Sequence, residues 1–350
     1  KPRFKTYFIG NIDPNESHSI LSKINLETTL FIVVSKSGST LETSKNYEII
    51  KNKLASLRLN DDQIKQHIIA VTRKDSAYDN KNFFLERLYI DNHIGGRFSV
   101  TSVVGTTLLY LNFNNTTVDN FLTGAHITDK EALNKDIRYN APLLAALIGV
   151  WERNICNYNA KAIIPYNSAL SRFVAHLQQT DCESNGKSVS RSGKILGYKT
   201  GPIIFGEPGT NAQHAFFQLL HQGTDIIPVQ FISTKESSLH SAIEKDAQVK
   251  LNKNCIAQMV ALAEGKIDKD PNKTFKGCRP STLIQLDSLN PFSLGALLSF
   301  YENLIMFQGL IWNINSFDQE GVQLGKVLAN ALNNDGDSTV HKIYNLFHRL

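Results

Sequence analysis

Short apolar runs alternate with longer amphipathic segments in the first third of the chain. Thr29–Val34 has the length and apolar character of a buried strand, and from about Thr40 apolar residues return at the three- and four-residue spacing of a helix. Such alternation predicts a parallel sheet with crossover helices. The other elements predicted in this part are strands over Phe4–Ile9, Ile68–Thr72 and Leu88–Ile90, and a helix over Ser17–Ile24.

The alternation restarts after a helical connection, in which Ala141–Val150 is apolar nearly all round and is predicted to be a buried helix. Further strands are predicted over Ala160–Pro165, Pro202–Phe205, Asp225–Ile232 and Ser281–Leu286, and further helices over Leu170–Gln179, Asn211–Gln222, about 238–264 and about 291–314. We therefore expect an α/β fold with two parallel-sheet domains. The expected parts are a first domain over 1–125, a helical connection over 126–159, a second domain over 160–321 and a C-terminal helical arm over 322–350.

Composition and charge narrow the function classes. Of the 350 residues, 42% are apolar and 20% are charged, as in ordinary globular proteins, and the charge-free apolar runs are shorter than a membrane span needs. The net charge of +5 is dispersed, without the basic run that indicates nucleic-acid binding. The four cysteines have neither metal-site nor disulfide-framework spacing, which favours thiols in a reducing compartment. The sequence starts at Lys1 without a methionine and is interpreted as a piece that begins inside a domain.

A polar loop, Ser35–Thr40, lies between the predicted strand Thr29–Val34 and the following helix. Ligands bind at the carboxyl ends of parallel strands, and N–H groups at a helix start favour phosphate. The loop adds four hydroxyl groups, the Lys36 ammonium group and a glycine at which the backbone can approach a ligand closely. A helix N-cap is the alternative interpretation, and the number of donors favours an anion site. The spacing is not that of a Walker A loop.

Two other segments carry candidate side chains for which a structural role is the simpler interpretation. In Gly95–Ser99, two glycines allow a tight turn that presents the Arg97 guanidinium group, although a surface arginine in a loop is the more common case. In Gln178–Lys187, a carboxylate at a helix-to-loop junction can serve as a general base. Spacing alone favours a solvated helix end closed by Gly186.

Gly206–His214 follows the predicted strand Pro202–Phe205 and opens a helix whose first turn holds His214. The helix dipole there disfavours a charged imidazole, which suits proton transfer. A single histidine is nevertheless more often structural.

The segment Ile314–Lys326 turns polar after a long apolar stretch. Its Gln319 and Lys326 are seven residues apart. If the segment is helical, that spacing of about two turns allows both side chains to face one site.

Five runs together resemble the glucose-6-phosphate isomerase (phosphoglucose isomerase) family, in the family's order and over nearly the whole chain. They are S-K-S-G-S-T-L-E-T at Ser35–Thr43, G-G-R-F-S-V at Gly95–Val100, Q-Q-T-D-C-E-S-N-G-K at Gln178–Lys187, G-E-P-G-T-N-A-Q-H-A-F-F-Q-L-L-H-Q-G-T at Gly206–Thr224, and N-S-F-D-Q-E-G-V-Q-L-G-K at Asn315–Lys326. The resemblance implies two sugar-isomerase (SIS-type) α/β sandwich domains and a C-terminal arm. It also implies reversible conversion of glucose 6-phosphate to fructose 6-phosphate through a cis-enediol(ate), in glycolysis and gluconeogenesis in the cytoplasm, without metal or cofactor.

The resemblance further assigns roles to residues of this chain. Glu183 is the implied base that moves a proton between C2 and C1 of the opened sugar, and Arg97 stabilises the enediolate. Lys326 and His214, the latter supplied by the second subunit of a homodimer, assist ring opening and closing. The other implied contacts are with the substrate: Ser35, Lys36, Ser37 and Thr40 hold the phosphate, and Gln179 and Gln319 hydrogen-bond the sugar.

The chain departs from the family pattern in two ways. Family members carry a glycine-rich G-I-G-G-S loop, which gives a backbone and a serine contact to the sugar phosphate, ahead of the strand where this sequence starts. The given sequence contains neither that loop nor the family's helical N-terminal portion. Glu320 and Gln323 stand where the family usually has tryptophan and glutamate, and we expect altered packing from these two differences.

Two other function classes remain open at this point. A non-catalytic sugar-phosphate-binding module would need the phosphate contacts but no base, so the joint presence of Glu183, His214 and Lys326 favours an enzyme. A nucleotide-dependent enzyme is disfavoured because the nucleotide-binding loops are missing.

Overall fold

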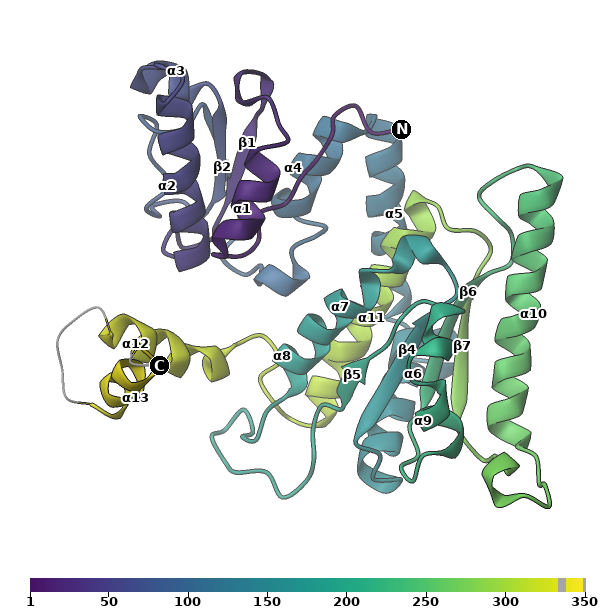
Figure 1. Cartoon of the computed structure of the whole chain (residues 1–350). Helices are drawn as coiled ribbons and strands as arrows, with labels where there is room; N and C mark the ends of the chain where they lie inside the picture. Colours follow the sequence, from purple (N-terminus) through teal and green to yellow (C-terminus); the bar gives the residue numbers. More distant parts are fainter. Residues whose placement is uncertain (333–337, 349–350) are drawn as a thin grey trace. The chain divides into compact units, whose positions relative to one another are not determined.

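The computed structural model describes residues 1–332 and 338–348, and the chain divides into two compact units (Figure 1). Unit 1 comprises Lys1–Leu133 and Leu289–Phe300, and unit 2 comprises Asn134–Ser288 and Tyr301–Leu350. The division at Leu133 falls inside the expected helical connection. The sequence pattern did not indicate that Leu289–Phe300 joins the first unit.

Unit 1 is built on a three-stranded parallel sheet in the order β1 (Phe31–Val34), β2 (Ile68–Thr72), β3 (Glu86–Tyr89). The predicted parallel arrangement is confirmed, and the strand predicted over Ile68–Thr72 has the predicted bounds. The helices of this unit are α1 (Pro14–Leu21), α2 (Leu41–Ala55), α3 (Asp61–Lys65), α4 (Val103–Asn112) and α5 (Asn115–Glu131), with 3-10 turns η1 (Leu26–Thr28) and η2 (Gly96–Phe98).

The core of unit 1 forms because β2 is buried along its whole length and α2 presents apolar residues four apart to the sheet. Leu54 of α2 and Ile68 of β2 are fully buried. The other buried members of this core are Leu21, Phe31, Val33, Ile50, Ile64, Ala70, Tyr78 and Phe84.

Unit 2 holds a four-stranded parallel sheet in the order β5 (Ile203–Phe205), β4 (Ala160–Pro165), β6 (Val229–Thr234), β7 (Ser281–Leu286). The bounds of β4 and β7 are those predicted. Its helical elements are η3 (Ile137–Tyr139), α6 (Ala141–Val150), η4 (Trp151–Ile155), η5 (Ser168–Leu170), α7 (Phe173–Leu177), η6 (Gln178–Cys182), α8 (Glu183–Asn185), η7 (Asn211–His214), α9 (Phe217–Gln222), α10 (Ala242–Glu264), η8 (Pro271–Lys273), η9 (Glu320–Val322), α12 (Gln323–Ala331) and α13 (Thr339–Phe347).

The long helix α10 runs along β6 and β7 (Figure 1) and contributes Cys255 and Leu262 to the core of unit 2. That core also contains Tyr166 and Phe231, whose rings are 5.9 Å apart. Every residue of β6 is buried, which is typical of a strand covered on both faces.

Helix α11 (Pro291–Ile311) contributes residues to both units. Among residues 1–332 and 338–348 it is the one helix long and apolar enough to cross a membrane by length and composition. Half of its most apolar window is buried inside the structure, as in a core helix, and it contains the acidic residue Glu302.

The strand predicted over Phe4–Ile9 is not observed. The segment bonds to α4 instead: the Phe4 N–H donates to the Asn112 side-chain oxygen at 3.2 Å, and the Asn112 amide donates to the Thr6 hydroxyl at 3.1 Å. The arm expected over 322–350 is helical where it is described, as α12 and α13, and residues 333–337 and 349–350 lie outside the described residues.

Candidate active site

The loop that follows β1 folds around its own hydroxyl groups. The Ser35 hydroxyl accepts a hydrogen bond from the Gly38 N–H at 3.1 Å and lies 3.1 Å from the Thr40 hydroxyl. Gly38 has a φ of +72°, and a Cβ there would press on Ala77 at 3.0 Å, so the turn requires glycine. Thr40 is the N-cap residue of α2 but makes no capping hydrogen bond through its side chain. Thr40 thus holds the N-cap position of the alternative interpretation without its capping hydrogen bond, and the start of α2 keeps its capacity for an anion.

Ser37 lies in the same loop and is bonded within it. Its hydroxyl oxygen accepts hydrogen bonds from the Ser39 N–H at 3.2 Å and from the Ser39 hydroxyl at 2.8 Å. Ser35, Ser37 and Thr40 are thus held in one short loop at the carboxyl end of β1.

The Lys36 ammonium group joins this loop to the segment that carries Arg97. It donates hydrogen bonds to the carbonyl oxygens of Asn92 and Ile94, both at 2.8 Å. An ammonium group has three donors, so one remains for a ligand. Arg97 lies in η2 with only 5% of its surface exposed, and its guanidinium group stacks over the Phe98 ring at 5.4 Å. Lys36 and the Arg97 turn therefore form one polar region of unit 1.

In unit 2, Glu183 follows a π-helical turn. The turn η6 covers Gln178–Cys182, and α8 begins at Glu183. Such turns are frequent at functional sites because they redirect side chains. The Gln179 amide donates to the half-buried Glu183 carboxylate at 3.4 Å. Thr180 and Ser184, on either side, are fully buried and fix the turn.

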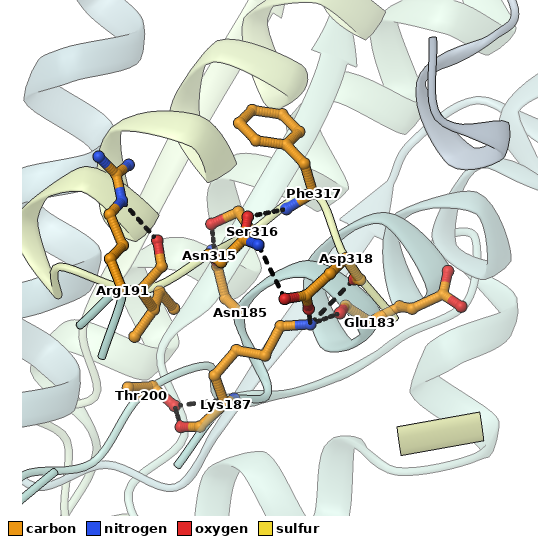
Figure 2. Close-up of polar contacts among 10 residues, drawn as sticks. Glu183, Asn185, Lys187, Arg191, Thr200, Asn315, Ser316, Phe317 and Asp318 are labelled. Atoms are coloured by element: carbon orange, nitrogen blue, oxygen red, sulfur yellow. Dashed lines mark hydrogen bonds and ion pairs between the residues drawn. The ribbon is translucent and has the colours of Figure 1, made fainter. Parts of the chain in front are cut away.

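Lys187 ties the Glu183 turn to the closing signature segment. Its ammonium group donates to the carbonyl oxygens of Glu183 and Asp318, each at 3.0 Å, and pairs with the Asp318 carboxylate at 2.8 Å. The Glu183 carboxylate itself points away from this cluster (Figure 2). The Thr200 hydroxyl fixes the Lys187 backbone by donating to its carbonyl oxygen at 2.6 Å.

Gly186 has a φ of −74°. The helix therefore does not end in a left-handed glycine cap, which was the alternative interpretation of this segment.

Two more hydrogen bonds hold the closing segment beside this turn (Figure 2). The Ser316 hydroxyl donates to the Asn185 side-chain oxygen at 2.8 Å, and the Arg191 guanidinium group donates to the Ile314 carbonyl oxygen at 3.0 Å. The Asn185 amide in turn donates to the Ile305 carbonyl oxygen at 3.1 Å. Segments that lie more than a hundred residues apart in the sequence thus form one wall.

Gln319 and Lys326 do not lie on one continuous helix. Gln319 has an extended φ of −152° and precedes the 3-10 turn η9, and α12 begins only at Gln323. The spacing of two helical turns therefore does not apply to this pair. Both side chains are exposed.

His214 is the last residue of η7, and the helix expected over Asn211–Gln222 is interrupted before α9. Its side chain is exposed. The neighbouring Gln213 anchors the turn by donating to the side-chain oxygen of Asn254 at 2.5 Å and to the Tyr166 hydroxyl at 3.2 Å. These two hydrogen bonds attach the turn that carries His214 to unit 2.

One buried acid beside Glu183 was not singled out from the sequence. Asp181 is 6% exposed, and burial raises the pKa of its carboxyl group to about 7, although the charge of Lys161 and a hydrogen bond from Asn185 act in the opposite direction. A signal was present in the sequence. Asp181 follows Leu177, a buried residue, by four positions and therefore lies on the apolar face of the helix.

The role of Lys36 can be tested by Lys36→Met. Loss of two charge-assisted hydrogen bonds should raise amide hydrogen exchange in residues 92–98 and lower the free energy of unfolding by about 1–2 kcal/mol. Lys53→Met, at an exposed position of α2, is the matched control and should leave exchange unchanged. Unchanged exchange in Lys36→Met would show that the ammonium group does not hold the Arg97 turn.

Lys187→Met tests the link between the Glu183 turn and the closing segment. We expect a loss of about 1–3 kcal/mol in unfolding free energy and faster amide exchange in residues 313–318, because a charged donor shared by three acceptors is removed. Lys194→Met, an exposed position of the same loop, should change neither. Equal stability and exchange in the two variants would contradict the proposed link.

Comparison with known proteins places this geometry in a family. Residues 1–345 match the protein family described as phosphoglucose isomerase. Glucose-6-phosphate isomerase of Treponema denticola is 54% identical over 339 residues, which cover 96% of this chain and 64% of the relative. The same enzyme of Protochlamydia amoebophila is 48% identical over 96% of this chain and 63% of its own length. The chain thus spans somewhat less than two thirds of these relatives.

A solved structure agrees with the sequence comparison. The crystal structure of a glucose-6-phosphate isomerase from Chlamydia trachomatis matches with a TM-score of 0.94 and 44% identity, covering 99% of this chain and 68% of that one. Both comparisons extend over nearly all of the described residues, including the five signature runs. The chain belongs to the phosphoglucose isomerase family.

Proposed function

We propose that this protein interconverts glucose 6-phosphate and fructose 6-phosphate by aldose–ketose isomerisation. Family membership supports the proposal, and one observation carries it within the chain. Glu183 is a half-buried carboxylate on a tightly held turn, with the Gln179 amide beside it and Lys187 bound to its backbone rather than to its carboxylate. That arrangement suits a general base.

The loop after β1 is the proposed phosphate site. Ser35, Ser37 and Thr40 supply hydroxyl groups beside the uncapped start of α2, and the remaining Lys36 donor supplies positive charge. Anchoring the phosphate fixes the sugar chain and lowers the entropy lost in reaching the transition state. Gln179 and Gln319 are proposed to hydrogen-bond the sugar hydroxyl groups.

The proposed reaction begins with opening of the sugar ring. His214 and Lys326 exchange protons with the ring oxygen and the C1 hydroxyl group, so that the open aldehyde forms. Glu183 then removes the C2 proton, and the electron pair moves to the carbonyl oxygen to give an enediolate that the Arg97 guanidinium group stabilises. Return of the same proton to C1, with transfer of a hydroxyl proton from O2 to O1, yields the ketose without change in overall oxidation state.

The proposed partner is a second copy of the chain. In the homodimer His214 would be supplied across the interface, a proposal supported by its exposed position at the end of η7. We further propose a cytoplasmic location, because both sugar phosphates are intermediates of glycolysis and gluconeogenesis.

Glu183→Gln in the full-length protein tests the base assignment. The amide keeps the size of the side chain but cannot accept the C2 proton, so kcat should fall at least about 100-fold. Binding of glucose 6-phosphate, measured by calorimetry, should remain close to that of the wild type. Glu264→Gln, at an exposed position of α10, is the matched control. Wild-type turnover in Glu183→Gln would refute the assignment.

A mixing experiment tests the shared site. His214→Ala and Glu183→Gln chains are each expected to be inactive alone. In a random mixture of dimers, one intact site forms in each heterodimer, which gives about a quarter of wild-type activity. No recovery in verified heterodimers would mean that His214 acts within its own subunit.

A further inference from the structure

A small cavity lies in unit 2 behind the turn that carries Glu183. Its volume is about 30 Å³, enough to hold a water molecule. Asp181 of η6, Gln308 of α11 and Lys161 of β4 contribute to its wall. The mechanism proposed above uses none of these three side chains.

Two acceptor atoms in this wall have no hydrogen-bond partner within the described chain. They are Asp181 Oδ1 and the Gln308 side-chain oxygen, in residues that are 6% and 4% exposed. Buried polar atoms in native proteins are nearly always bonded to protein or to ordered water. A water molecule carries two hydrogen-bond donors, and a proton on the Asp181 carboxyl group turns one of its oxygens into a donor.

The charges around Asp181 do not offset the cost of ionising it. The Lys161 ammonium group pairs with the Glu152 carboxylate at 2.9 Å, and both side chains are mostly buried. The positive charge that favours the ionised form of Asp181 is therefore already shared, and burial dominates the pKa of its carboxyl group. The titratable or charged groups that line the cavity or adjoin Asp181 are Glu152, Arg153, Tyr158, Lys161, Cys182 and Tyr301.

Asp181 is also connected to the backbone around Glu183. Asn185 acts on Asp181 by lowering the pKa of its carboxyl group, and its side-chain oxygen accepts a hydrogen bond from the Ser316 hydroxyl at 2.8 Å. Asp181 and Asn185 flank Glu183 at two residues on either side. A change in the charge of Asp181 therefore acts on both ends of the turn and, through Ser316, on the closing segment.

We propose that Asp181 is a positioning residue for Glu183: its buried carboxyl group lines the cavity two residues before Glu183, and its protonation state sets the geometry of the Glu183 turn. The expected effect of Asp181 on turnover rests on the proposed isomerase function. Its expected effect on the pH dependence of stability does not.

Stability against pH gives the first test. The pKa of Asp181 is raised in the folded chain from 3.8 to about 7, so the native state holds the proton over a range in which the unfolded chain has lost it. This contribution is fully present below the ordinary carboxyl pKa and is lost as pH rises to and through about 7. The denaturation midpoint of the wild type should therefore fall relative to that of Asp181→Asn between about pH 5 and about pH 8. Parallel midpoints across this range would overturn the proposal.

Two further variants guard against a folding defect in Asp181→Asn. Glu152→Gln keeps the Asp181 carboxyl group but leaves the Lys161 charge available to it, which lowers the pKa of Asp181. The fall of the denaturation midpoint with rising pH should therefore occur at lower pH in this variant than in the wild type. An unshifted fall would contradict the assignment. Asp246→Asn, at an exposed position of α10, is the control and should follow the wild type at every pH.

Turnover against pH gives the second test, in the full-length protein. Because asparagine mimics the protonated acid, Asp181→Asn should match the wild-type kcat near pH 6 and diverge from it near pH 8, with KM little changed, at the pH where the wild type loses the proton. A constant ratio of kcat values would show that Asp181 only fills space. If the wild type does not isomerise the sugar phosphates, the proposed function fails, and the denaturation series still decides the role of Asp181.

Discussion

The candidate site of unit 2 depends on the interactions of the Lys187 ammonium group. This group binds the carbonyl oxygen of Glu183 and both the carbonyl oxygen and the carboxylate of Asp318, residues that are otherwise separated by most of the second half of the chain. Because the group is only 16% exposed, its charge must be satisfied by the protein, and the three acceptors do this together. The Glu183 carboxylate points away from this cluster (Figure 2).

Parallel sheet topology supplies the second constraint. In each unit the chain leaves the carboxyl end of a strand and enters a helix through a polar loop: Ser35–Thr40 after β1, and Gly206–Thr210 after β5. These ends collect backbone donors and short polar side chains, which is why the sites of such folds lie there. The hydroxyl groups of the first loop bond to one another rather than capping α2. Packing of the core thus positions the groups that are proposed to bind and react.

The sequence allowed much of the fold to be predicted, because buried parallel strands are short apolar runs. The bounds of Ile68–Thr72, Ala160–Pro165 and Ser281–Leu286 were predicted correctly. Phe4–Ile9 was predicted as a strand because its pattern suits one, but pairing needs a neighbouring strand, which a local pattern cannot reveal. The break between Gln319 and α12 was missed because the seven-residue spacing of Gln319 and Lys326 gives no information on the backbone conformation between them.

The residues of the candidate site were named from the signature runs, and their roles stay proposals. The contribution of Lys187 could not be predicted, since it depends on Asp318, a partner distant in sequence. That of Asp181 was missed although its spacing from Leu177 was a signal. The central claim is that Glu183 carries the proton between C2 and C1. It is tested most directly by nuclear magnetic resonance of glucose 6-phosphate incubated with the full-length protein in deuterium oxide. The account predicts deuterium at C2 with the wild type and none with Glu183→Gln, while deuterium uptake at the wild-type rate in Glu183→Gln would contradict it.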